Sequence, residues 1–178
     1  WNVYVSLGGI VALFDFGFNT TFARNITFCW SGAKKLDKES VESRRNLDNE
    51  PDFTLMKKVL ITCKRIYLVI SAAALLLLWT LGTVYILYLT REIDSKEYVI
   101  SWLIYSIAIF MNLYFGYYDS FLRGVGDIAD VNKYKILARI VQICLLAGLL
   151  YCGFGIVGAS IAYLCYGYVF RTAAKRRF

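Results

Sequence analysis

The chain has 178 residues, of which 58% are hydrophobic, and it contains a single proline. Ordinary soluble domains are only about 45 to 50% apolar, so the composition excludes such a domain and predicts a membrane protein. The net charge of +7 comes from 20 Lys and Arg against 13 Asp and Glu. Because the basic residues follow the ends of apolar stretches, membrane topology and anionic lipids account for them, and nucleic-acid binding is not expected.

The predicted fold class is all-α, a polytopic transmembrane helix bundle. A helical span needs about 20 residues to cross the hydrocarbon core, and five stretches are long or apolar enough to do so. They fill the chain as a single transmembrane domain and leave no room for a second globular unit. The predicted spans lie near residues 2–22, 66–90, 98–118, 136–151 and 155–170, with a cytoplasmic loop at residues 25–65.

The basic residues also predict the orientation of the chain. Eighteen of the 20 Lys and Arg lie in every second connecting segment, namely 24–65, 123–139 and 171–177. The other two lie in segment 91–97, on the opposite side of the membrane. The positive-inside rule makes the rich side cytoplasmic, so the first residue lies outside and the last inside. Since the termini lie on opposite sides and the chain begins with Trp, we expect an internal piece of a longer protein.

The first predicted span carries several polar side chains, among them Asp15 and Asn19. In one continuous helix they are four residues apart and share a face. An ionisable group costs about 2.5 to 3.5 kcal/mol in a span, so Asp15 is expected to face the bundle interior or a cavity. It is either a carboxylate that contacts a cation or substrate, or a structural hydrogen-bond acceptor. Asn19 has the same two interpretations.

Two further helix faces are marked by their composition. Small residues in the last span form overlapping small-xxx-small patterns, which predict close helix packing. The third span carries a polar stripe at helical spacing through the depth of the membrane. The small residues are Gly155, Gly158, Ala159 and Ala162, and the stripe is Ser101, Tyr105, Ala108, Asn112, Gly116, Asp119 and Arg123.

Three arginines, Arg24, Arg123 and Arg139, lie near the cytoplasmic ends of predicted spans. Each alone is explained by a side chain that extends to lipid phosphate. Together, on separate helices, they can surround an inward-open vestibule and neutralise a phosphate-bearing ligand. Gln142 and Asn112 can add neutral hydrogen bonds to the same cavity.

The chain contains no histidine. Its absence removes the commonest general base and every Ser-His or Cys-His nucleophilic pair. The five cysteines form no CxxC pair, so neither a zinc nor a haem site is predicted. We therefore expect no catalytic residues, no metal and no cofactor.

Two segments, LFDFGFNTTFARNI and YYDSFLRGVGDIADVNKYKILARI, resemble polysaccharide flippases of the multidrug/oligosaccharidyl-lipid/polysaccharide exporter superfamily, in particular bacterial O-antigen unit translocases. The first is similar in its apolar-Asp-x-Gly stretch followed by Thr and Arg. The second is similar in its aromatic cluster, its Leu-x-Gly-x-Gly turn and the Lys and Arg that follow. The matching residues are Asp15, Gly17, Thr20 and Arg24, then Tyr117, Tyr118, Leu122, Gly124, Gly126, Lys133 and Arg139.

The resemblance implies that the chain is spans two to six of the amino-terminal six-helix lobe of a two-lobe transporter. Such a transporter moves undecaprenyl-pyrophosphate-linked oligosaccharide, an O-antigen or similar unit of lipopolysaccharide biosynthesis, across the bacterial inner membrane by alternating access. No bond is broken, so the protein is not an enzyme, and residue 1 lies on the periplasmic side. The implied partners are the lipid-linked oligosaccharide, membrane lipids, a coupling proton or sodium ion, a polysaccharide polymerase and a chain-length regulator.

Under this hypothesis the pyrophosphate and sugar are bound by the three arginines together with Asn112 and Gln142. Asp15 and Asn19 are the first candidates for coupling transport to the proton or sodium ion or for setting the electrostatics of the cavity, and Asp119 is the second. One alternative is a drug or metabolite exporter of the same superfamily, which prefers an acidic cavity. A second alternative is a membrane enzyme of polysaccharide assembly, which is expected to carry a large outside loop or a cytoplasmic DxD site. A third is a structural subunit.

Overall fold

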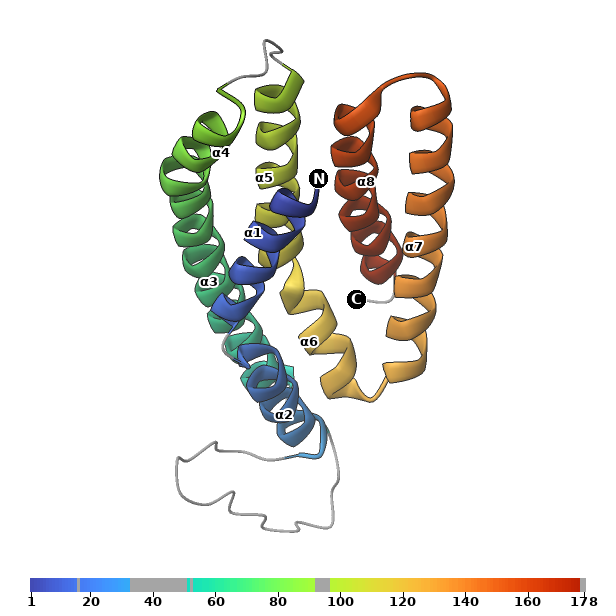
Figure 1. Ribbon diagram of the computed structural model, residues 1–178. Coiled ribbons are helices and arrows are strands. Elements are labelled where there is room, and N and C mark those ends of the chain that lie inside the picture. Colours follow the sequence, from blue (N-terminus) through green and yellow to red (C-terminus); the bar gives the residue numbers. More distant parts are fainter. Residues whose placement is uncertain (16, 33–50, 52, 92–96, 177–178) are drawn as a thin grey trace.

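The computed structural model describes residues 1–15, 17–32, 51, 53–91 and 97–176. Within these ranges every regular element is a helix, which confirms the predicted all-α bundle (Figure 1). In chain order the elements are α1 (Asn2–Ala12), a 3-10 helix (Leu13–Asp15), α2 (Phe18–Trp30), α3 (Phe53–Leu77), a π-helical turn (Leu78–Gly82), α4 (Thr83–Leu89), α5 (Glu97–Tyr114), α6 (Gly116–Val125), α7 (Ile128–Tyr151) and α8 (Gly155–Lys175).

The bundle is that of a membrane protein. Among the described residues, four helical stretches are long and apolar enough to cross a bilayer. The fifth predicted span, residues 155–170, is helical as α8 but is not one of these four. The four stretches are Asn2–Trp30, Phe53–Leu89, Glu97–Val125 and Ile128–Tyr151.

The helices extend further than the predicted spans. Helix α2 continues to Trp30 and α3 begins at Phe53, so the described ends of the predicted loop 25–65 are helical. Residues 33–50 of that loop lie outside the described residues. A helix does not have to end where the hydrocarbon ends, because its polar residues can continue it into the headgroup region and water. Lys57 and Lys58, both exposed on α3, do this.

The first predicted span is two helices rather than one. Helix α1 gives way to the 3-10 turn, and Gly17 adopts a left-handed backbone conformation with φ of 74° directly before α2. A left-handed residue cannot continue an α-helix, and glycine adopts this conformation without a steric penalty. The hydroxyl of Thr20 donates to the Gly17 carbonyl at 2.7 Å. The prediction that Asp15 and Asn19 share one helix face is therefore wrong.

The ends of the helices alternate between two sides of the bundle (Figure 1). Helix α2 ends and α3 begins on the side of the α6–α7 turn, which we call the α6–α7 end. Helix α4 ends and α5 begins on the opposite side, with the α7–α8 turn, which we call the α7–α8 end. This arrangement matches the alternation of basic and non-basic segments in the sequence.

Two buried clusters, one around α5 and one around α6, form the core. The cluster around α5 is centred on Trp102 and Tyr105, which pack on α1, α3 and α4. The Trp102 indole N–H donates to the Thr83 hydroxyl at 3.1 Å. The cluster around α6 places Tyr117 and Leu122 against α2, α3 and α7. Helices α5 and α6, joined at Phe115, thus lie at the centre of the bundle and contribute to both clusters.

The polar stripe of the third span faces protein, and its first half packs on α8. Ser101 and Ser160 hydroxyls are 2.8 Å apart. One turn further along, the rings of Tyr105 and Tyr163 lie 5.1 Å apart between centroids. Asn112 then packs directly on Gly167. The three contacts advance along both helices together, so α5 and α8 pack in parallel.

Glycines allow the closest helix contacts. A Cβ atom added to Gly124 of α6 would lie 2.6 Å from Cβ of Ile26 and 2.7 Å from the carbonyl oxygen of Ala23, both on α2. The Thr27 hydroxyl donates to the Gly124 carbonyl at 2.9 Å across the same contact. At Gly158 of α8, a Cβ would lie 2.9 Å from Cβ of Leu149 on α7. Gly158 of the last span therefore serves close packing as predicted, whereas nothing lies within 4 Å of a Cβ added to Gly155.

We expect Gly124→Ala to destabilise the protein by about 1 to 3 kcal/mol, because the new methyl group has no space between α6 and α2. The matched control is Gly148→Ala on α7, where nothing lies within 4 Å of the added Cβ. Unfolding of the two variants in detergent, followed by circular dichroism, gives the comparison. Equal stability of the two variants would contradict the described α2–α6 contact.

Candidate functional site

A polar cluster is built around Asp119 at the α6–α7 end. Its Oδ2 accepts a hydrogen bond from Nδ2 of Asn19 on α2 at 3.0 Å. Its Oδ1 lies 3.0 Å from Nε of Arg123 on α6 and 3.0 Å from Nζ of Lys135 on α7. One carboxylate on α6 thus connects its own helix to α7 and to α2, which is distant in the sequence.

The burial of these side chains determines how much the contacts contribute to stability. The Asp119 side chain is only 13% exposed, whereas those of Arg123 and Lys135 are 37% and 35% exposed. A carboxylate this deep is stable only because two cations and an amide compensate for the lost hydration. The two cations are about one third exposed and retain solvent access, so they can exchange Asp119 for another anion more readily than a fully buried pair could.

Arg139 extends the cluster towards the middle of the membrane. Its Nη1 donates to Oε1 of the buried Gln142 at 2.9 Å, and its guanidinium lies 4.8 Å from the ring centre of Tyr166 on α8. Arg139 precedes the end of α7 at Tyr151 by twelve residues, about 18 Å at about 1.5 Å per residue. A cation at that depth is costly unless it has polar or aromatic partners, and this one has both.

Lys135 and Arg139 face an aromatic pair on α8. Nζ of Lys135 lies 5.9 Å from the ring centre of Phe170, in the same manner that Arg139 lies over Tyr166. Each pair is spaced by four residues on its helix, so the two contacts are adjacent turns of an antiparallel packing. With three cations and one carboxylate, the cluster of Asn19, Asp119, Arg123, Lys135, Arg139, Gln142 and Tyr166 carries a net charge of +2.

The structure brings five predicted site residues into this cluster: Asn19, Asp119, Arg123, Arg139 and Gln142. The sequence analysis missed Lys135 and Tyr166. A signal for Lys135 was available, because it shares one face of α7 with Arg139 and Gln142 at spacings of four and seven residues. Tyr166 had no such signal, since only the packing of α8 on α7 places its ring under Arg139.

The other predicted site residues contact different partners. Asp15 accepts a hydrogen bond from the Tyr67 hydroxyl on α3 at 2.9 Å. Arg24 is exposed, and its guanidinium lies 5.3 Å over the ring of Phe28 on its own helix. Asn112 packs on α8, and its Nδ2 is buried without a hydrogen-bond partner among the described residues. The described contacts therefore do not join these three residues to the cluster.

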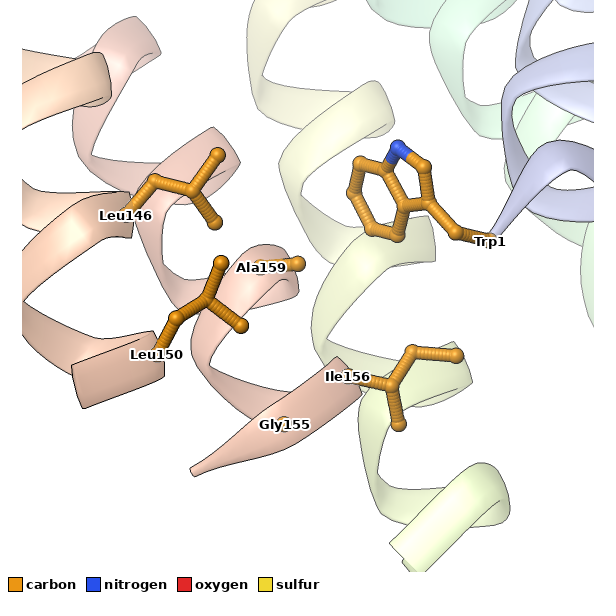
Figure 2. A pocket seen from close by; sticks show the side chains of 6 residues that line it. All are labelled: Trp1, Leu146, Leu150, Gly155, Ile156 and Ala159. Atoms are coloured by element: carbon orange, nitrogen blue, oxygen red, sulfur yellow. The ribbon is translucent and has the colours of Figure 1, made fainter. Parts of the chain in front are cut away.

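A larger cavity lies towards the α7–α8 end but carries no polar chemistry. It has a volume of about 420 Å³. Figure 2 shows the indole of Trp1 on one side, two leucines of α7 on the other and the first turns of α8 between them. Since its lining is apolar side chains and a glycine, the cavity suits hydrocarbon and not a charged headgroup. The lining residues are Trp1, Leu146, Leu150, Gly155, Ile156 and Ala159.

Comparison with known proteins adds no assignment: no protein-family model, no curated protein and no solved structure matches the chain. Within the described ranges, no three His, Cys, Asp or Glu side chains come together as metal ligands would. What the described residues define is a helical membrane protein with a cationic cluster that reaches the middle of α7.

Lys135→Gln is expected to destabilise the protein by about 1 to 2 kcal/mol, because it removes a charge-assisted bond to a mostly buried carboxylate. Lys133→Gln, two residues away on α7, is the control. Its side chain is 74% exposed, and such pairs contribute about 0 to 1 kcal/mol. Denaturant titration of both variants in detergent micelles measures the difference, and an equal effect of the two substitutions would show that Lys135 does not anchor α7.

Proposed function

We propose that the protein is part of a transporter that moves a phosphate-bearing lipid across a membrane, and specifically of a flippase for undecaprenyl-pyrophosphate-linked oligosaccharide in the bacterial inner membrane. The specific substrate and membrane come from the resemblance of two segments to O-antigen unit translocases. The cationic cluster supports the phosphate chemistry independently of that resemblance. The basic, α6–α7 end is the cytoplasmic one in this proposal.

The observation that carries the proposal is Arg139, which lies midway along α7 and contacts Gln142 and Tyr166. A guanidinium presents a planar fork of donors that matches phosphate oxygens. Only Nη1 has a described hydrogen bond, to Gln142, so other donors of the fork are available to a ligand. Lys135 lies one turn towards the α6–α7 end and supplies a second positive charge for a pyrophosphate.

Asp119 acts in this proposal as the resting counter-ion of the site. In the absence of substrate it holds Arg123 and Lys135 and so fixes α7 against α6. An incoming pyrophosphate competes for the same two cations, which weakens that connection at the moment of binding. A transporter needs such a link between binding and helix movement, because a ligand shifts a conformational equilibrium only through differential contacts.

Asp15 is the better candidate for coupling to a proton or sodium ion. Its described partner is the neutral hydroxyl of Tyr67, whereas Asp119 is held by two cations. Asp15 can therefore bind a cation without breaking an ion pair. It also lies at the break between α1 and α2, where Gly17 allows a change in the angle of the two helices.

The same contacts argue against an exporter of cationic drugs. Such an exporter needs a carboxylate that is free to face the substrate, and the carboxylate of the cluster is already held by Arg123 and Lys135. The excess charge of the cluster is positive, so a cationic compound would be repelled from it.

Complementation tests the function. In a strain that lacks its own O-unit translocase, the full-length protein is expected to restore surface polysaccharide, and Arg139→Gln to reduce it at least about tenfold, the equivalent of about 1.4 kcal/mol, at matched membrane expression. Arg176→Gln, an exposed arginine at the end of α8, serves as the charge-matched control.

The outcomes separate the alternatives. Loss of polysaccharide in Arg139→Gln but not in Arg176→Gln supports a phosphate-binding role for the cluster. Wild-type activity in Arg139→Gln would overturn that role. Failure of the wild type in several polysaccharide backgrounds would overturn the flippase itself. A parallel Asp15→Asn variant is expected to lose transport while retaining the substrate-bound state, since Asp15 lies outside the cluster.

A further inference from the structure

A second, smaller groove lies between the parallel helices α5 and α8. It has a volume of about 200 Å³. One wall is Met111 of α5 and Phe115 at the α5–α6 junction, and the α8 wall includes Leu164, Cys165 and Tyr168. The groove is apolar along these walls and has one charged residue, Arg171, in its lining.

Arg171 is fixed in this groove by an aromatic contact. Its guanidinium lies 4.0 Å above the ring of Phe115, a short cation–π distance. Among the described residues no carboxylate lies within ion-pair distance of it, in contrast to Arg123 and Lys135. A half-buried cation beside hydrocarbon needs a counter-charge, so the groove is complementary to an anion with an apolar body.

The depth of Arg171 matches the level of lipid headgroups. It follows the start of α8 at Gly155 by sixteen residues, about 24 Å along the helix axis. That distance approaches the hydrocarbon thickness of about 30 Å, so Arg171 lies near the α6–α7 surface of the membrane. Leu164 lies seven residues, about 10 Å, deeper. The groove therefore leads from headgroup level into the hydrocarbon.

We propose that this groove is a binding site for an anionic phospholipid, whose phosphate contacts Arg171 and whose acyl chain lies between α5 and α8. Basic pockets between transmembrane helices on the cytoplasmic side are known to bind anionic headgroups. The site is distinct from the cationic cluster, because none of the residues that line the groove is a member of the cluster, which is formed by residues of α2, α6 and α7 together with Tyr166. It does not depend on the proposed transport activity.

Cys165 in the wall of the groove reports on its occupancy. Cys144 and Cys152 are exposed and are replaced by Ala, while Cys29 and Cys63 are buried at 0% and 1% exposure. The purified protein in lipid-free detergent is alkylated with a membrane-soluble maleimide, with phosphatidylglycerol or phosphatidylcholine added at equal mole fraction. Phosphatidylglycerol is expected to slow labelling of Cys165 at least about threefold more than phosphatidylcholine, because its chain covers the thiol.

Arg171→Gln is expected to abolish the difference between the two lipids, and Arg176→Gln, five residues further along α8, to retain it. Leu164→Trp fills the groove without changing its charge and is also expected to remove the effect of phosphatidylglycerol. Equal protection of the wild type by both lipids would overturn the proposal. So would protection by inorganic phosphate alone, an equal loss in Arg171→Gln and Arg176→Gln, or full phosphatidylglycerol protection in Leu164→Trp.

Discussion

The carboxylate of Asp119 constrains the α6–α7 end of the bundle more than any other described group. It is mostly buried, and its charge is tolerable there only because Asn19, Arg123 and Lys135 approach it at 3.0 Å from three helices. Each partner is thereby fixed in position as well, so α2, α6 and α7 are held in one arrangement. The positions of Lys135 and Arg139 over the rings of α8 follow from that arrangement.

Helix α8 contacts two regions of different character. Against α7 it presents Tyr166 and Phe170 to two cations, and against α5 it forms the parallel series of contacts that runs from Ser160 to Gly167. Arg171 lies beyond that series, over Phe115. Lys135 and Arg139 thus contact rings of α8, whereas Arg171 of α8 contacts the ring of Phe115.

Several features differed from prediction for identifiable physical reasons. Hydropathy does not register backbone conformation, so the left-handed Gly17 and the break it causes were missed. Charge ends an apolar stretch but not a helix, so α3 begins well inside the predicted loop, at Phe53. Arg24 and Arg139 look equivalent as arginines near span ends. Each has a partner on its own helix, Phe28 for Arg24 and Gln142 for Arg139, but only the packing of α8 on α7 gives Arg139 the ring of Tyr166 as well.

The sequence by itself determined the all-α class, the membrane environment and the alternation of helix ends, because these depend on the length, apolarity and charge of contiguous segments. It also singled out Asn19, Asp119, Arg123, Arg139 and Gln142, but by the same reasoning it singled out Asp15, Arg24 and Asn112, which the described contacts do not join to the cluster. The tertiary structure alone decided which of these meet. Asn19 and Asp119 are one hundred residues apart, and the angle at which helices pack, which no local pattern encodes, brings their side chains together.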